Sequence, residues 1–107
     1  MNREERIGLN EAVFREVNER IDDLAETFEL DQLDLVCECG DGDCVERISM
    51  SHAEYEQVRS DPQLFAVYPG HEANDVETVE ERRGRYDIVR KSQGAPERIA
   101  EQTSPRD

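Results

Sequence analysis

The segment CECGDGDC, residues 37–44, holds all three cysteines of the 107-residue chain. It continues an apolar run that begins at Leu33 and is typical of a strand, in which residues two apart point to the same side. Cys37 and Cys39 therefore present two sulfur atoms on one face. The glycines and aspartates between Cys39 and Cys44 favour a turn, and a second apolar run follows. The pattern predicts that three thiolates meet at the end of a hairpin.

Three thiolates leave one position open, because zinc in structural sites takes four tetrahedral ligands, mostly from Cys and His. The chain has two histidines. His71 lies in a Pro-Gly-His loop directly after an apolar run, from which it could reach a metal. His52 begins an expected helix, and its ring could reach back toward Cys44. A carboxylate of Asp41 or Asp43, or a water molecule, would also complete the site.

Zinc-ligand spacing does not decide among these alternatives, and we take His71 as the preferred fourth ligand. The predicted zinc site is Cys37, Cys39, Cys44 and His71. The cysteines could instead be inert core residues, or a disulfide with one free thiol. A solvated turn between clustered cysteines favours metal binding in a chain that we expect to be intracellular.

Charge and composition restrict the partners. The formal net charge is -14, which argues against direct binding of nucleic acid and of anionic membrane surfaces. Another protein is the expected partner, although an acidic surface also serves to keep a cytosolic protein in solution. Neither a secretory signal nor a membrane-spanning stretch is visible, so we expect a cytoplasmic protein. Large apolar side chains are few, and a structural zinc would stabilise such a small core.

A helix is expected over residues 8–29, because helical periodicity is the clearest signal in the chain. Its apolar stripe is Ile7, Phe14, Val17, Ile21, Leu24 and Phe28, and its charged side is Glu11, Arg15, Glu16, Glu19, Arg20, Asp22, Asp23 and Glu26. We expect the apolar stripe to pack on the sheet of its own domain. The heptad spacing could alternatively pair the helix with a partner or with a second copy in a homodimer.

The predicted fold class is α+β, with the long N-terminal helix packed on a small, mainly antiparallel sheet of about five strands. Strands are expected at 33–39, 44–50 and 64–68, and residues 76–83 and 86–90 are expected to form a hairpin. Ser51 and Glu54 form a capping box that should begin a second helix. Residues 1–92 are expected to form a single domain, and residues 93–107 a polar tail with a short helix.

Four stretches together resemble a family of small uncharacterised bacterial proteins. They are FREVNERI at 14–21, VCEC at 36–39 with Cys44, AEY at 53–55, and VYPGHE at 67–72. In that family a Cys-x-Cys-x4-Cys element is paired with a Pro-Gly-His loop. The resemblance extends to about Lys91 and implies His71 as the fourth ligand, and it implies no activity.

No catalytic motif stands out, and we expect a non-catalytic protein-interaction or regulatory module that binds zinc. The alternative is a redox or metal sensor, in which oxidation of the thiolates would release the metal. A zinc-dependent enzyme is the third hypothesis, with an activated water on the metal and Glu38, Glu72 or Asp43 as a base. Three thiolates would weaken the Lewis acidity that such an enzyme needs.

Overall fold

The long N-terminal helix, α1 (Arg3–Thr27), begins at a capping box that the sequence analysis overlooked. In the computed structural model, which describes residues 1–106, the Asn2 side chain accepts a hydrogen bond from the Glu5 amide (2.8 Å). The Glu5 carboxylate in turn accepts one from the Asn2 amide. This reciprocal cap satisfies two free amides and begins the helix before the expected residue 8. The helix ends at Thr27, because Glu29 takes a left-handed conformation (φ 57°).

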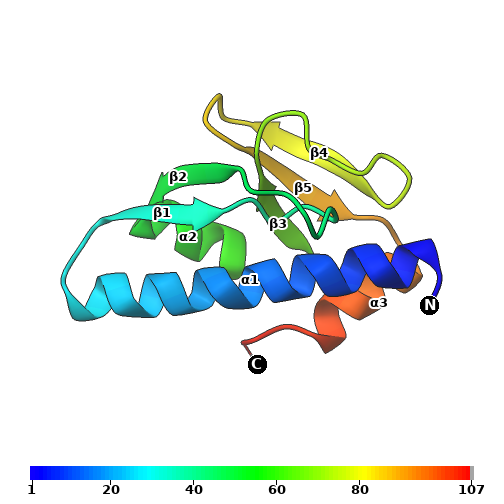
Figure 1. Ribbon diagram of the computed structural model, residues 1–107, viewed down its shortest axis with the longest axis horizontal. Helices are drawn as coiled ribbons and strands as arrows, with labels where there is room; N and C mark the ends of the chain where they lie inside the picture. The colour runs from blue at the N-terminus through cyan, green and yellow to red at the C-terminus, as the bar shows by residue number, and fades with distance from the viewer. Residues whose placement is uncertain (107) are drawn as a thin grey trace.

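The five strands form two antiparallel sheets. The first contains β1 (Gln32–Val36) and β2 (Arg47–Ser51), and the second contains β3 (Leu64–Val67), β4 (Glu77–Arg82) and β5 (Asp87–Lys91) in the order β3-β5-β4. Two helices complete the fold, α2 (His52–Arg59) and α3 (Ala95–Gln102). The α+β class is confirmed, with the expected strands divided between two small sheets. Figure 1 shows α1 running along one side of both sheets.

Local signals in the sequence place several elements correctly. The Ser51–Glu54 capping box is present, with the Ser51 amide donating to the Glu54 carboxylate at 2.8 Å. The hairpin expected from residues 76–83 and 86–90 is the β4–β5 pair. Both features depend on residues close in sequence, so a local pattern is enough to predict them.

The expected strands at 33–39 and 44–50 were too long on their loop side. The ladder ends at the pair Val36 and Arg47, so all three cysteines lie in the connecting loop. The Cys37 amide still bonds the Glu46 carbonyl (3.1 Å), but the next amide, of Glu38, bonds the Ala66 carbonyl of β3 (2.9 Å). The chain therefore leaves the first sheet at this point because its backbone pairs with the second.

The face of α1 that packs inward contains only part of the predicted apolar stripe. Ile7 is buried and Ile21 packs against the core, but Leu24 and Phe28 are at least 60% exposed. The polar residues Glu11, Arg15 and Asn18, at most 1% exposed, take the inward positions instead. The prediction was wrong for these positions because buried polar groups are tolerated when they are hydrogen-bonded, and these residues have partners across the fold. Lys91 of β5, for example, donates to Glu11 at 2.6 Å.

Asn18 docks α1 against β1 with its side-chain amide. Its Nδ2 donates to the Val36 carbonyl and its Oδ1 accepts from the Val36 amide, both at 2.9 Å. The side chain thus makes the pair of bonds that a neighbouring strand would make at this edge of the sheet. One polar residue therefore sets the position of the helix along β1.

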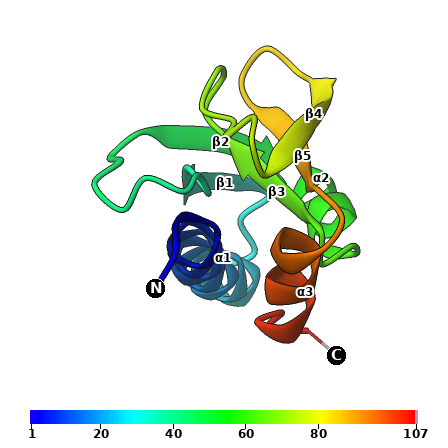
Figure 2. The same cartoon turned by 90° about the vertical axis from the view of Figure 1, so that its right-hand side faces the viewer.

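The C-terminal helix α3 lies beside α1, as Figure 2 shows end on. Arg15 donates to the Ala100 carbonyl and to the Thr103 hydroxyl, at 3.0 and 2.9 Å. Gly8 allows the close approach, since a Cβ there would lie 2.7 Å from the Ile99 side chain. Beyond the helix, Arg106 forms ion pairs with Glu19 of α1 and Glu56 of α2.

Candidate metal centre

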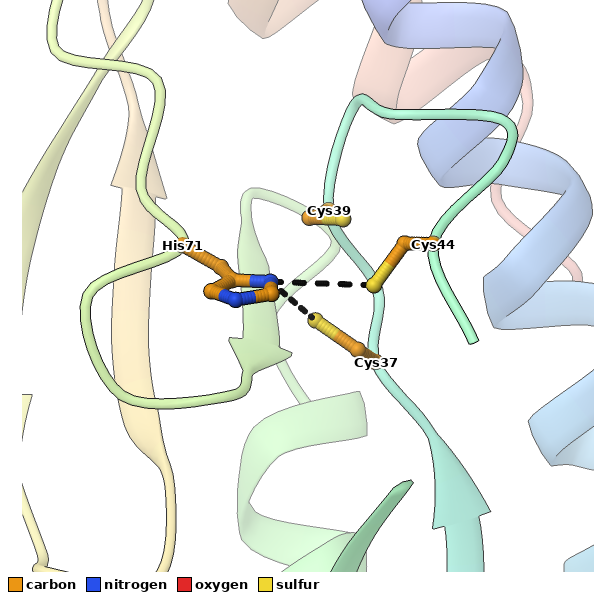
Figure 3. Close-up of side chains that lie close together, drawn as sticks. All are labelled: Cys37, Cys39, Cys44 and His71. Atoms are coloured by element: carbon orange, nitrogen blue, oxygen red, sulfur yellow. Dashed lines mark hydrogen bonds between the residues drawn. The ribbon is translucent and has the colours of Figure 1, made fainter. Parts of the chain in front are cut away.

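The loop between β1 and β2 and the loop between β3 and β4 meet at a cluster of sulfur and nitrogen atoms. Cys37, Cys39 and Cys44 come from the first loop and His71 from the second, so that one ligand atom of each lies within 4.8 Å of the others. Figure 3 shows the imidazole directed at the sulfurs. His71 Nδ1 lies 3.7 Å from Cys37 Sγ and 3.6 Å from Cys44 Sγ. This group could hold a metal ion.

Two separations between ligand atoms agree with the dimensions of a zinc site. Bond lengths of about 2.3 Å to sulfur and about 2.0–2.1 Å to nitrogen, at a tetrahedral angle, place the two ligand atoms about 3.6 Å apart. The two nitrogen-to-sulfur distances are 3.7 and 3.6 Å. Three thiolates and an imidazole form a soft donor set that suits Zn²⁺ far better than Mg²⁺ or Ca²⁺. The residues therefore fit zinc in both geometry and chemistry.

Short hydrogen-bonded turns hold the cysteine loop in shape. The Asp43 amide donates to the Asp41 side chain (2.9 Å), and the Cys44 amide donates to the Asp41 carbonyl (3.0 Å). This turn brings Cys44 back toward Cys37. Gly40 is needed where the loop passes α1, since a Cβ there would lie 2.5 Å from the Ile7 side chain.

The His71 loop is held as tightly. The His71 amide donates to the Tyr68 carbonyl (2.9 Å), and Gly70 adopts a φ of 86° that favours glycine. The Gly70 amide donates to the buried Asp87 carboxylate of β5 (3.1 Å). The Tyr68 amide donates to Cys37 Sγ at 3.1 Å, so the two loops are already joined by a bond to a ligand sulfur.

The protonation of the cysteines reflects their proximity. A hydrogen bond from Cys37 lowers the pKa of Cys39 to about 5, while the same bond and then burial raise the pKa of Cys37. Burial raises the pKa of Cys44. A bound zinc would hold all three sulfurs as thiolates, because the metal ligand is the thiolate.

Glu38, between two of the cysteines, was considered from the sequence only as a catalytic base, and its supporting role in the fold was missed. Its carboxylate accepts hydrogen bonds from Arg59 (2.6 and 3.1 Å), from Asn18 (2.7 Å) and from the Ala66 amide (3.0 Å). A buried carboxylate with four such bonds holds the loop backbone in place. Both carboxylate oxygens of Glu38 are thus engaged by Arg59, Asn18 and Ala66.

The other candidate ligands are not part of the four-residue cluster. His52 Nδ1 is 2.7 Å from the Asp22 carboxylate, and this bond raises the pKa of His52. Glu56 lies close enough to these two to form a second group of donor atoms. The Arg106 guanidinium already pairs with Glu56 at 2.8 Å, so the positive charge beside this second group is supplied by the protein itself. The Asp41 side chain is taken up by the turn within its own loop.

A cavity of about 470 Å³ opens beside the cluster. Cys39, His71 and Glu72 line it together with Arg3 from the start of α1. One carboxylate oxygen of Glu72 is buried there without a hydrogen-bond partner among residues 1–106. Cys44 is partly exposed, whereas Cys37 and Cys39 are 2% exposed. Small molecules therefore have a route to the edge of the cluster.

Comparisons with protein families, with curated proteins and with solved structures found no match. The resemblance to the bacterial family with a Pro-Gly-His loop therefore stays a prediction. None of the helices described for residues 1–106 combines the length and apolar character needed to cross a membrane.

Proposed function

We propose that this chain is a small cytoplasmic zinc-binding protein, and that it is a non-catalytic protein-interaction module whose metal joins its two sheets. The observation that carries the proposal is the origin of the ligands. Three sulfurs lie beyond the end of the β1–β2 sheet, and His71 belongs to the β3–β4 connection. A zinc ion bound by all four would tie the loop beyond the first sheet to a loop of the second sheet.

Two further observations support a structural role for the metal. Four protein ligands would fill the tetrahedral shell, and catalytic zinc sites usually keep one position for water. Two of the ligands, Cys37 and Cys39, also lie in the second core cluster, where they pack with Phe65, Val67 and Val89. Zinc binding would therefore contribute directly to the free energy of folding. Reduced thiolates are maintained in the cytoplasm, which supports that location.

The two histidines offer a matched test. We expect one zinc per chain, measured by mass spectrometry under native conditions, in the protein purified without chelator and in a His52→Ala variant. A His71→Ala variant should hold zinc more weakly, and a Cys39→Ala variant should lose it together with much of its thermal stability. Equal zinc content and equal stability in all four proteins would overturn the proposal.

A redox sensor is the second candidate, favoured by the partial exposure of Cys44 next to two buried sulfurs. Hydrogen peroxide would oxidise two thiolates to a disulfide, itself being reduced to water, and the zinc would leave. Zinc release under mild peroxide, followed with a chromogenic chelator and reversed by dithiothreitol, would support this function. A purely structural site should retain its zinc under the same conditions.

A further inference from the structure

The outer side of α1 carries a stripe of exposed apolar side chains. Val13, Leu24 and Phe28 are 60, 60 and 69% exposed, and Leu30 just after the helix is 58% exposed. With Val17 and the half-buried Ile21 they recur every three or four residues, so they share one side of the helix. Contiguous apolar surface of this kind marks interaction sites in soluble proteins. We name these residues the outer stripe.

The fold makes little use of the outer stripe for its own packing. The inward side of α1 is formed by Glu11, Arg15, Asn18 and Asp22, each held by polar partners in the strands, in α3 or in α2. Turning the helix to bury the stripe would break all of these contacts. The apolar side therefore faces outward as a consequence of how the inner side is held.

At its C-terminal end the outer stripe opens into a groove of about 300 Å³. Ile21, Leu24, Phe28, Leu30 and Asp34 are among the residues that line it. They come from the end of α1 and the start of β1, and Figure 1 shows the turn that joins these two elements. An apolar groove beside an exposed helical stripe has the shape into which an amphipathic helix places its apolar side.

The rim of this groove is acidic. Asp34 lines it with its side chain 75% exposed, and Glu29 and Asp31 flank Leu30 in the turn. Arg47 pairs with Asp34 at 3.2 Å, whereas Glu29 and Asp31 form no ion pair among residues 1–106. The charge around the groove thus has the same sign as the net charge of -14 on the whole chain.

We propose that the outer stripe and its groove bind an amphipathic helix of a partner protein, with apolar side chains flanked by lysine or arginine. This inference rests on the proposed interaction function and adds the surface and the chemistry of the partner. Basic flanks would complement the acidic rim and speed association. A second copy is disfavoured as the occupant, because each copy carries a formal charge of -14 and like charges oppose association.

The test uses the zinc-loaded full chain and a synthetic amphipathic peptide of leucine and lysine, with the leucines on one helical side. Binding is measured by calorimetry and mapped by amide chemical shifts. We expect binding that weakens with added salt and shifts centred on Leu24, Phe28 and Leu30. A Leu24→Ser, Phe28→Ser double variant should bind at least roughly tenfold more weakly, because anchor side chains carry most of the affinity. Val45→Ser, 84% exposed elsewhere, should bind as the natural chain does.

Four results would overturn the inference. They are failure of the leucine and lysine peptide to bind, equal binding of a leucine and glutamate peptide, unchanged binding by the double variant, and a dimer in light scattering that the double variant dissociates. The last result would show that the outer stripe binds a second copy of the chain. Zinc content is measured on the same samples, so a failure of peptide binding with zinc retained rejects this surface alone. Absence of zinc from the natural chain would reject the structural metal site, and the peptide measurements on the same chain would still accept or reject the surface.

Discussion

The inner side of α1 buries several polar side chains, whereas its outer side exposes several apolar ones. The inner side buries Glu11, Arg15 and Asn18 against the strands and α3, and the outer side exposes Leu24 and Phe28. The difference teaches that hydropathy does not by itself decide which side of a helix faces the core. Burying a polar group is costly only when its hydrogen bonds are lost, and here most partners are supplied by other elements.

The largest effect is expected from the buried ion pair behind the inner side. Arg59 Nη1 lies 2.6 Å from the Glu38 carboxylate, and both side chains are almost fully buried. An Arg59→Leu variant leaves the Glu38 charge buried without its cation, which should lower the free energy of unfolding by about 3–5 kcal/mol. Urea denaturation measures the change.

Arg47→Leu is the matched control, because Arg47 forms an exposed pair with Asp34. Exposed pairs contribute about 1 kcal/mol or less, so this variant should unfold close to the natural chain. Similar losses in the two variants would show that the buried pair does not hold the inner side in place.

A second prediction compares neighbours on the same helix. Asn18→Ala removes both bonds to Val36 and leaves buried backbone groups unpaired, which should cost about 2–3 kcal/mol of unfolding free energy. Val17→Ala, on the outer stripe, should cost well under about 1 kcal/mol, because Val17 is already 38% exposed. Thermal and chemical unfolding of the two variants show which substitution costs more stability. If Val17→Ala proved the more damaging, the apolar side would be the one that faces the core.

The third prediction concerns pH. Burial, followed by the nearby Glu77 carboxyl, raises the pKa of Glu11 well above its ordinary value. The pKa of a glutamate in the unfolded chain is about 4.3. Because the pKa of Glu11 is higher in the folded chain, its contribution to stability is fully present below about pH 4.3 and is lost as the pH rises through the folded-state pKa. A Glu11→Gln variant lacks this titration. Its stability relative to the natural chain should therefore increase with pH in that window, by at most about 1.4 kcal/mol per pH unit.

Urea titrations of both proteins across the acidic range measure this difference. The Lys91 ammonium, which bonds both Glu11 and Glu77, retains Glu77 as its anion in the variant. A difference between the two proteins that is constant with pH would mean that Glu11 titrates in the folded chain as it does in the unfolded chain.

The smallest effect is expected on the outer side. Phe28→Ser removes a side chain that is 69% exposed, so the unfolding free energy should change by about 0.5 kcal/mol or less. Differential scanning calorimetry and zinc content should be those of the natural chain. A loss comparable to that of Asn18→Ala would show that the fold itself uses the outer stripe.

Part of the fold and of the candidate site was predictable, because the signals are local. The capping box of Ser51 and Glu54 needs only residues three apart. The sulfurs of Cys37 and Cys39 share a side because of the period of an extended chain. The capping box of Asn2 and Glu5 carries the same kind of signal and could have placed the start of α1.

The remaining features depend on residues far apart in the sequence. Spacing alone could not choose between His71 and His52, since the choice follows from how the β3–β4 loop meets the cysteine loop. Which side of α1 faces inward depends on Lys91, 80 positions beyond Glu11, and on α3, which contacts Arg15. Exchanging the buried and exposed sides leaves the helical period unchanged, so no count along the chain distinguishes them.

The amino-acid sequence by itself determined the α+β class, the helices and strands, and the cysteine cluster, because these arise from backbone preferences and short spacings. Only the tertiary structure decided that His71 meets the sulfurs, that α1 turns its polar side inward, and that Glu38 holds the loop from within. The physical reason is that a buried polar group is stable only beside its partners. Those partners are brought together when the whole chain packs.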